Sequence, residues 1–233
     1  MNIEYRISND ELAGCIDHTL LSATATGEQI RQLCEEAKSY GFCAVSVNPR
    51  WVALSAELLH SSKVKVGGVV SLPLGADSTK IKIAQAKACI FDGADEIDMV
   101  ADLAAIIEGD SRYLSNQLKA VLKVCCSMRP AVCLKVIIES AALTRQQKIF
   151  ACRIADKLGV DFVKTSTGMN PAGGATVEDV KLMKEYAPRC KIKAAGGIRT
   201  AEQVFEMLDA GAERIGTSSG VQIINQFRAG RLQ

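Results

Sequence analysis

Lys164 stands at the end of a short apolar run and directly before a turn rich in hydroxyl groups and glycine, in the segment DFVKTSTG. An ammonium group in such a place loses hydration, and burial favours the neutral amine by lowering its pKa. A neutral amine is a nucleophile that can form a Schiff base with an aldehyde or a ketone. On this segment alone, the simpler interpretation is a lysine that reaches solvent from the end of a strand.

Four other charged residues stand inside apolar runs of the same kind: Asp17, Asp98, Lys135 and Lys193. Strands of a parallel sheet covered by helices are nearly all apolar, so a charge inside one needs an explanation. Side chains alternate between the two faces of a strand, and the apolar neighbours suit the face under the helices, so we expect all five charges on the inner face. Any one of them is more simply explained as a structural ion pair, but the five together predict a polar active centre.

The five charges predict acid–base chemistry around an amine. A second ammonium group beside Lys164 would lower the pKa of its amine, and Asp98 with Lys193 would transfer protons directly or through water. The chain has two histidines and no HExxH motif, and Cys125 and Cys126 are adjacent rather than spaced as CxxC. We therefore expect no metal and no other cofactor.

Three turns rich in glycine and hydroxyl residues follow the last expected strands, at 165–168, 195–198 and 216–220. Glycine lets backbone amides approach an anion closely, and a helix N-terminus adds unpaired N–H groups and a partial positive charge. Any one such turn is weak evidence, because turns commonly contain glycine. Their position after consecutive late strands predicts a phosphorylated substrate.

Eight β-like segments alternate with longer segments of helical period. We expect strands at 15–18, 44–47, 65–72, 96–100, 132–138, 161–164, 191–195 and 214–217, with amphipathic helices such as 28–40 and 144–158 between them. A short helical segment, about 8–14, precedes the first strand. Lys65 begins its strand and is expected at the solvent end. Capping boxes are expected at Thr26, Thr144 and Thr200, and C-terminal glycine caps at Gly41, Gly159 and Gly211.

This alternation predicts a parallel sheet covered by helices and closed into a (β/α)₈ barrel, as a single domain over residues 1–233. A doubly wound open sheet is the alternative, although no GxGxxG motif follows an early strand. In either fold the site should lie beyond the C-terminal ends of the strands.

Composition excludes several classes of function. A net charge of +2, from 28 basic and 26 acidic residues, provides no broad field for nucleic acid or a membrane surface. The first 14 residues lack the apolar core of a signal peptide, and no apolar run approaches the ~20 residues that cross a bilayer. The nine scattered cysteines suit reduced thiols. We expect a cytoplasmic protein with a small-molecule substrate, no nucleic acid and no membrane partner.

The segments IDHTLL, EIDMV, LKVIIE, DFVKTSTG, GGATVEDV, IKAAGGIRT and RIGTSSG resemble the 2-deoxyribose-5-phosphate aldolases, class I aldolases of the TIM-barrel fold. The resemblance runs from about Asp17 to Ile224. It implies a Schiff base on Lys164 and proton transfer by Asp98 and Lys193. It places Asp17, Thr19, Lys135 and Thr167 around the substrate, and Gly168, Gly196, Gly197, Ser218 and Ser219 near its phosphate. Barrels of this family associate through their outer helices, so a homodimer or homotetramer is expected.

The resemblance implies reversible cleavage of 2-deoxy-D-ribose 5-phosphate to acetaldehyde and D-glyceraldehyde 3-phosphate. The sequence departs from the family at Ser46, where the family often has cysteine, and at residues 169–172, which replace a more usual Phe-Ser turn; it also ends in RAGRLQ, where some members end in tyrosine. A sugar-phosphate isomerase or another Schiff-base lyase on the same barrel is one alternative, because the fold does not determine the chemistry. A non-catalytic sensor of sugar phosphates is the other.

Overall fold

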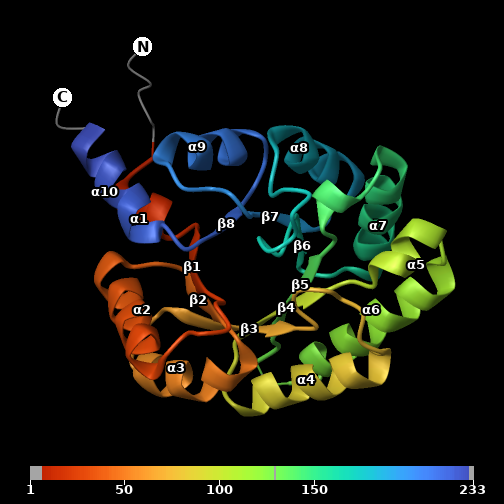
Figure 1. Cartoon of the computed structure of the whole chain (residues 1–233), viewed down its shortest axis with the longest axis horizontal. Coiled ribbons are helices and arrows are strands. Elements are labelled where there is room, and N and C mark those ends of the chain that lie inside the picture. The colour runs from red at the N-terminus through yellow and green to blue at the C-terminus, as the bar shows by residue number, and fades with distance from the viewer. Residues whose placement is uncertain (1–6, 129, 231–233) are drawn as a thin grey trace.

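The predicted closed barrel is confirmed by the computed structural model, which describes residues 7–128 and 130–230. Eight parallel strands form a ring in which each pairs with its neighbours in sequence and β8 pairs with β1. Figure 1 shows the helices outside this ring, with α10 lying beside α1. The strands are β1 (Ile16–Leu20), β2 (Ala44–Val47), β3 (Lys65–Val70), β4 (Glu96–Val100), β5 (Cys133–Ile137), β6 (Phe162–Lys164), β7 (Lys191–Ala195) and β8 (Arg214–Thr217).

The helices follow the strands in alternation, with short additional helices in three of the connections. They are α1 (Asn9–Ala13), α2 (Gly27–Tyr40), α3 (Val52–Leu59), α4 (Thr79–Phe91), α5 (Leu103–Glu108), α6 (Ser111–Cys126), α7 (Arg145–Leu158), α8 (Val177–Tyr186), α9 (Ala201–Asp209) and α10 (Gly220–Gly230). Two 3₁₀ turns, Pro49–Trp51 and Ser140–Ala142, complete the set. No helix in the described residues is long and apolar enough to cross a bilayer.

Local capping signals correctly place five of the six helix ends for which a cap was predicted. The capping boxes at Thr26, Thr144 and Thr200 are all present, and Gly41 and Gly159 end their helices in the left-handed conformation. The expected cap at Gly211 is wrong by one residue, because α9 ends with Ala210 as its C-cap and Gly211 follows with φ 107°. Each cap pairs backbone groups that a helix end would otherwise leave without partners.

Strand ends differ from the prediction by up to two residues. The strand expected at 65–72 stops at Val70, because Ser71 turns the chain with φ 57°. Lys65 lies at the solvent end as expected, with its side chain 54% exposed and paired with Asp95.

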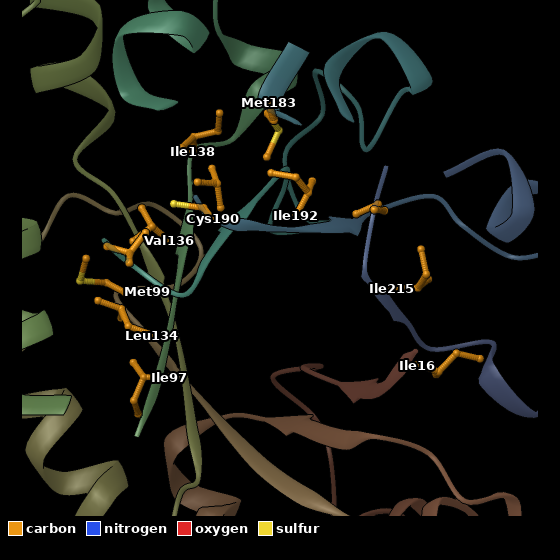
Figure 2. Close-up of a cluster of buried hydrophobic side chains, with 14 of the residues drawn as sticks. Ile16, Ile97, Met99, Leu134, Val136, Ile138, Met183, Cys190, Ile192 and Ile215 are labelled. Carbon is orange, nitrogen blue, oxygen red and sulfur yellow. The ribbon is translucent and has the colours of Figure 1, made fainter. Parts of the chain in front are cut away.

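Side chains pack in two layers, one inside the barrel and one between the strands and the surrounding helices. Figure 2 shows part of the outer layer, where Ile97 and Met99 of β4 lie near Leu134 and Val136 of β5. The residues between them, Asp98 and Lys135, alternate to the opposite face and are partners in the strand register. The apolar layer thus holds the sheet against the helices and leaves the inner face to polar residues.

Candidate active site

Asp98 lies at the centre of a buried cluster that joins the three predicted lysines. Its Oδ2 accepts hydrogen bonds from Nζ of Lys164 and Nζ of Lys193, each at 2.7 Å, and its Oδ1 accepts one from Nζ of Lys135 at 2.8 Å. Lys164 and Lys193 are register partners on β6 and β7, which places their side chains next to each other. The expected proximity of these charges is therefore found in the fold.

A lower set of contacts extends the cluster toward the N-terminal ends of the strands. Oδ2 of Asp17 accepts from Lys193 at 2.5 Å and lies 3.3 Å from Lys135, which also binds Glu96. Nη1 of Arg214 donates to Oδ1 of Asp17 at 2.7 Å and lies 3.2 Å from Oε2 of Glu96. All five predicted charges thus meet in one network.

Glu96 and Arg214 are the members that sequence reasoning missed. Each is the first residue of its strand, where a charge ordinarily reaches solvent. The sequence did contain a signal for Glu96: it is two residues before Asp98, and side chains two residues apart lie on the same face of a strand. Arg214 is the register partner of Lys193, which turns it toward the same interior.

Burial and charge together determine the protonation of the cluster. Burial lowers the pKa of Lys164 to about 8; Asp98 opposes this shift and Lys193 adds to it. Burial alone would raise the pKa of Asp98, but Lys135, Lys164 and Lys193 hold it well below its ordinary value. Burial would lower the pKa of Lys135, but Asp17, Asp98 and Glu96 hold it well above. Lys164 is therefore an amine that titrates near physiological pH beside a carboxylate that stays ionised.

A cavity of about 380 Å³ opens above Lys164 at the C-terminal end of the barrel. The loops that follow β1, β6, β7 and β8 supply its walls. Of the predicted residues, it is lined by Thr19, Lys164, Thr167, Gly168, Gly196, Gly197 and Ser218. The cavity therefore lies at the C-terminal ends of the strands, where the sequence predicted the site.

Five predicted site residues do not line this cavity. Asp17, Asp98, Lys135 and Lys193 are at most 1% exposed and lie in the cluster behind Lys164. Ser219 borders a separate hollow beside His18 and Glu36. Among the clustered charges, Lys164 is thus the one that lines the cavity, and the others lie behind it.

Glu139 organises the loop that follows Lys164, and sequence reasoning missed it. Its carboxylate is buried, its backbone has φ 53°, and its Oε1 accepts the N–H of Thr167 at 3.1 Å. The hydroxyl of Thr167 accepts the N–H of Met169 at 3.1 Å. The N–H and the hydroxyl of Thr167 are therefore both engaged in hydrogen bonds, and Thr167 and Gly168 line the cavity.

Glycine is required where the loops after β6 and β7 touch. A Cβ atom at Gly174 would lie 2.1 Å from the carbonyl oxygen of Gly196, which is a severe overlap with backbone. Gly196 itself has φ 90°, which L residues with side chains rarely adopt. Gly196 lines the cavity above Lys164, and Gly174 and Gly196 together line a neighbouring hollow.

Arg199 supplies the second cation of the described cavity lining, and the sequence prediction did not single it out. It follows the Gly196-Gly197 pair in the motif AAGGIRT and is exposed. The N-terminus of α10 begins at Gly220, directly after Ser218 and Ser219. A guanidinium group, a helix N-terminus and glycine-rich backbone form a setting that suits an anionic group. In the described part of the chain, no group of three His, Cys, Asp or Glu side chains is placed to hold a metal.

Comparison with known proteins agrees with this geometry. Residues 12–226 match the model of the DeoC/LacD family aldolases. A deoxyribose-phosphate aldolase of Thermococcus gammatolerans is 50% identical over 221 residues, 94% of this chain and 97% of that protein. One of Caldicellulosiruptor saccharolyticus is 48% identical over 94% of this chain and 100% of that protein.

Solved structures give the same result. A putative deoxyribose-phosphate aldolase of Coccidioides immitis superimposes with a TM-score of 0.91 at 39% identity, over 95% of this chain and 87% of that chain. A tetrameric deoxyribose phosphate aldolase of Aeropyrum pernix gives a TM-score of 0.88 at 30% identity, over 95% of this chain and 93% of that one. The chain therefore belongs to the DeoC/LacD family of aldolases.

Proposed function

We propose that this chain reversibly cleaves 2-deoxy-D-ribose 5-phosphate to acetaldehyde and D-glyceraldehyde 3-phosphate through a Schiff base on Lys164. The observation that carries the proposal is the position of Lys164, whose amine has a pKa lowered to about 8 and borders the cavity. At pH 7 about a tenth of such an amine is neutral, against roughly 3 parts in 10,000 for an ordinary lysine. Relatives at 48–50% identity carry the name deoxyribose-phosphate aldolase.

The reaction begins when the neutral amine of Lys164 attacks the open-chain aldehyde at C1. The carbinolamine that forms loses water and becomes an iminium ion, whose positive charge lies next to the ionised Asp98. Asp98 stabilises this charge, since its Oδ2 already holds the Lys164 nitrogen at 2.7 Å. The iminium then accepts the electron pair of the C2–C3 bond as that bond breaks.

Proton transfer completes the cycle. A base of the Asp98 and Lys193 pair removes the C3 hydroxyl proton, and a water molecule relays it because neither side chain lines the cavity. Cleavage releases D-glyceraldehyde 3-phosphate and leaves an enamine on Lys164. Protonation at C2 regenerates an iminium ion, and its hydrolysis releases acetaldehyde and the free lysine.

The phosphate of the substrate is assigned to the outer wall of the cavity. Arg199 brings a permanent positive charge there, and Gly168, Gly196 and Gly197 expose backbone to the same space. Ser218 adds a hydroxyl group immediately before the N-terminus of α10. This arrangement orients C1 toward Lys164 when the phosphate end is bound.

The proposal extends to assembly and location. A homodimer or homotetramer is supported by the tetrameric relative from Aeropyrum pernix. A cytoplasmic location is supported by the nine cysteines scattered through the sequence, which suit a reducing compartment.

Borohydride trapping tests the central step. Incubation with substrate and borohydride should produce a stable adduct that peptide mass spectrometry locates on Lys164. Lys164→Met should lose both the adduct and acetaldehyde release by at least about 1,000-fold, or ~4 kcal/mol of transition-state stabilisation. Lys184→Met is the matched control, because Lys184 is an exposed lysine paired with Glu213 on the outer surface. An adduct on another lysine, or the absence of acetaldehyde release by the wild type, would contradict the proposal.

A further inference from the structure

Seven ionisable side chains form one closed network inside the barrel. They are Asp17 on β1, Glu96 and Asp98 on β4, Lys135 on β5, Lys164 on β6, Lys193 on β7 and Arg214 on β8. Three are carboxylates and four are cations. The network is therefore electrically neutral only when one of the four cations gives up its proton.

The contacts show which cation has the weakest hold on its proton. Lys135 is paired with Asp17, Glu96 and Asp98, and Lys193 is paired with Asp17 and Asp98. Lys164 is paired with Asp98 alone, through an oxygen that also binds Lys193. In a buried network, the proton leaves the amine with the least anionic support.

Arg214 and Glu96 set this balance from the lower end of the barrel. The Arg214 guanidinium contacts both Asp17 and Glu96, and cannot lose its proton at accessible pH. Glu96 contacts Lys135 and Arg214. Neither residue lines the cavity above Lys164, so neither touches the substrate.

We propose that Glu96 and Arg214 are positioning residues that set the charge of the buried network. With them, three carboxylates are balanced by three cations, and Lys164 is the amine that loses its proton. This inference rests on the proposed Schiff-base function. It makes the free amine a property of the charge count of the whole network as well as of the local burial of Lys164. Arg214 favours the neutral form of Lys164, and Glu96 opposes it.

The other ionisable groups near the network leave this count unchanged. Burial raises the pKa of Cys15, which lies near Arg214, and raises that of Cys43 to about 11 and that of Cys133 to about 12, so all three thiols are neutral at physiological pH. Lys65 and Lys191, at the first positions of β3 and β7, are exposed. The ring of Phe162 lies 5.3 Å below the Arg214 guanidinium and carries no charge.

Two charge-removing variants make opposite predictions. The readout is the rate of borohydride-trapped adduct formation on Lys164 with acetaldehyde, measured against pH. In Arg214→Gln the network with a neutral Lys164 has one carboxylate more than it has cations. Lys164 therefore retains its proton to higher pH, and the midpoint of the profile rises by about one pH unit or more. In Glu96→Gln the network has one excess cation, and the midpoint falls by a similar amount. At pH 7, adduct formation should drop about tenfold in the first variant and rise in the second.

The double variant and two conservative variants complete the design. Glu96→Gln combined with Arg214→Gln restores the charge balance, and its midpoint should return close to that of the wild type. Arg214→Lys and Glu96→Asp disturb the packing but keep the charge, so their midpoints should stay at the wild-type value even if the fold is less stable. They also keep the proposal testable if a glutamine variant does not fold.

The outcomes separate the inference from the function on which it depends. If the wild type forms no adduct on Lys164, the Schiff-base function itself is refuted. If the wild type forms the adduct but the two single variants shift the midpoint in the same direction or not at all, the positioning role is refuted. A shift in Arg214→Lys as large as that in Arg214→Gln would refute it as well.

Discussion

Replacing Lys193 with methionine should return Lys164 toward an ordinary, protonated lysine. Both nitrogens bind Oδ2 of Asp98 at 2.7 Å, so they lie no more than about 5.4 Å apart. Two positive charges at roughly 5 Å repel by about 3 kcal/mol with an effective dielectric constant near 20. Removing this repulsion lowers the free-amine fraction at neutral pH roughly 100-fold. Asp98 would also pair more strongly with the remaining lysine, which acts in the same direction.

Adduct formation measures this effect without requiring turnover. Lys193 is also proposed to transfer protons, so a loss of acetaldehyde release alone would not identify the cause. Trapping of acetaldehyde on Lys164 with cyanoborohydride between pH 6 and 10 reports the free amine directly. The wild-type profile should rise through a pKa of about 8, and the profile of Lys193→Met should rise at a clearly higher pH.

A matched control and a clear negative result accompany this experiment. Lys184→Met removes an exposed lysine from the surface and should leave the profile unchanged. A Lys193→Met profile that still rises near pH 8 would show that the neighbouring charge has no effect. Burial alone would then account for the lowered pKa of Lys164, and the reasoning from charge repulsion would fail.

Three further predictions concern the cavity, the loops and a buried lysine outside the charged network. Arg199→Gln should raise KM for the phosphorylated sugar about tenfold, because a charge-assisted hydrogen bond is lost. KM for unphosphorylated deoxyribose should not change. Equal effects on both sugars would contradict phosphate binding by Arg199. Gly174→Ala should destabilise the fold by about 1–3 kcal/mol because its Cβ would lie 2.1 Å from a backbone oxygen, whereas Gly230→Ala, which meets nothing within 4 Å, should be nearly neutral in urea denaturation. Lys82 is fully buried, donates to the carbonyl oxygen of Val100 at 2.8 Å, and has its pKa lowered by burial to about 8. Between about pH 8 and 10.5 the unfolded chain binds more protons at Lys82 than the folded chain does, so this lysine should raise the free energy of unfolding of the wild type by up to ~3 kcal/mol over that range. Lys82→Met should remove that part of the rise.

The alternation of apolar and charged residues made the barrel and most of its charged interior predictable. A strand has a period of two, so a charge between isoleucine or valine neighbours has a determined face once the helices cover the other. Asp98 and Lys164 could be assigned in this way, and capping residues such as Thr26 predicted the helix starts because capping is local.

Only the tertiary structure decided which charges meet and which of them reach the cavity. Glu96 and Arg214 begin their strands, and their burial depends on how the strands are staggered around the ring, which no local pattern records. The position of Asp17 behind Lys193, and that of Glu139 under the N–H of Thr167, likewise depend on contacts between distant segments. Residue type and periodicity determined that a lysine would be buried among charges. The number and placement of its neighbours, which determine whether that lysine is free to react, follow from closing the barrel.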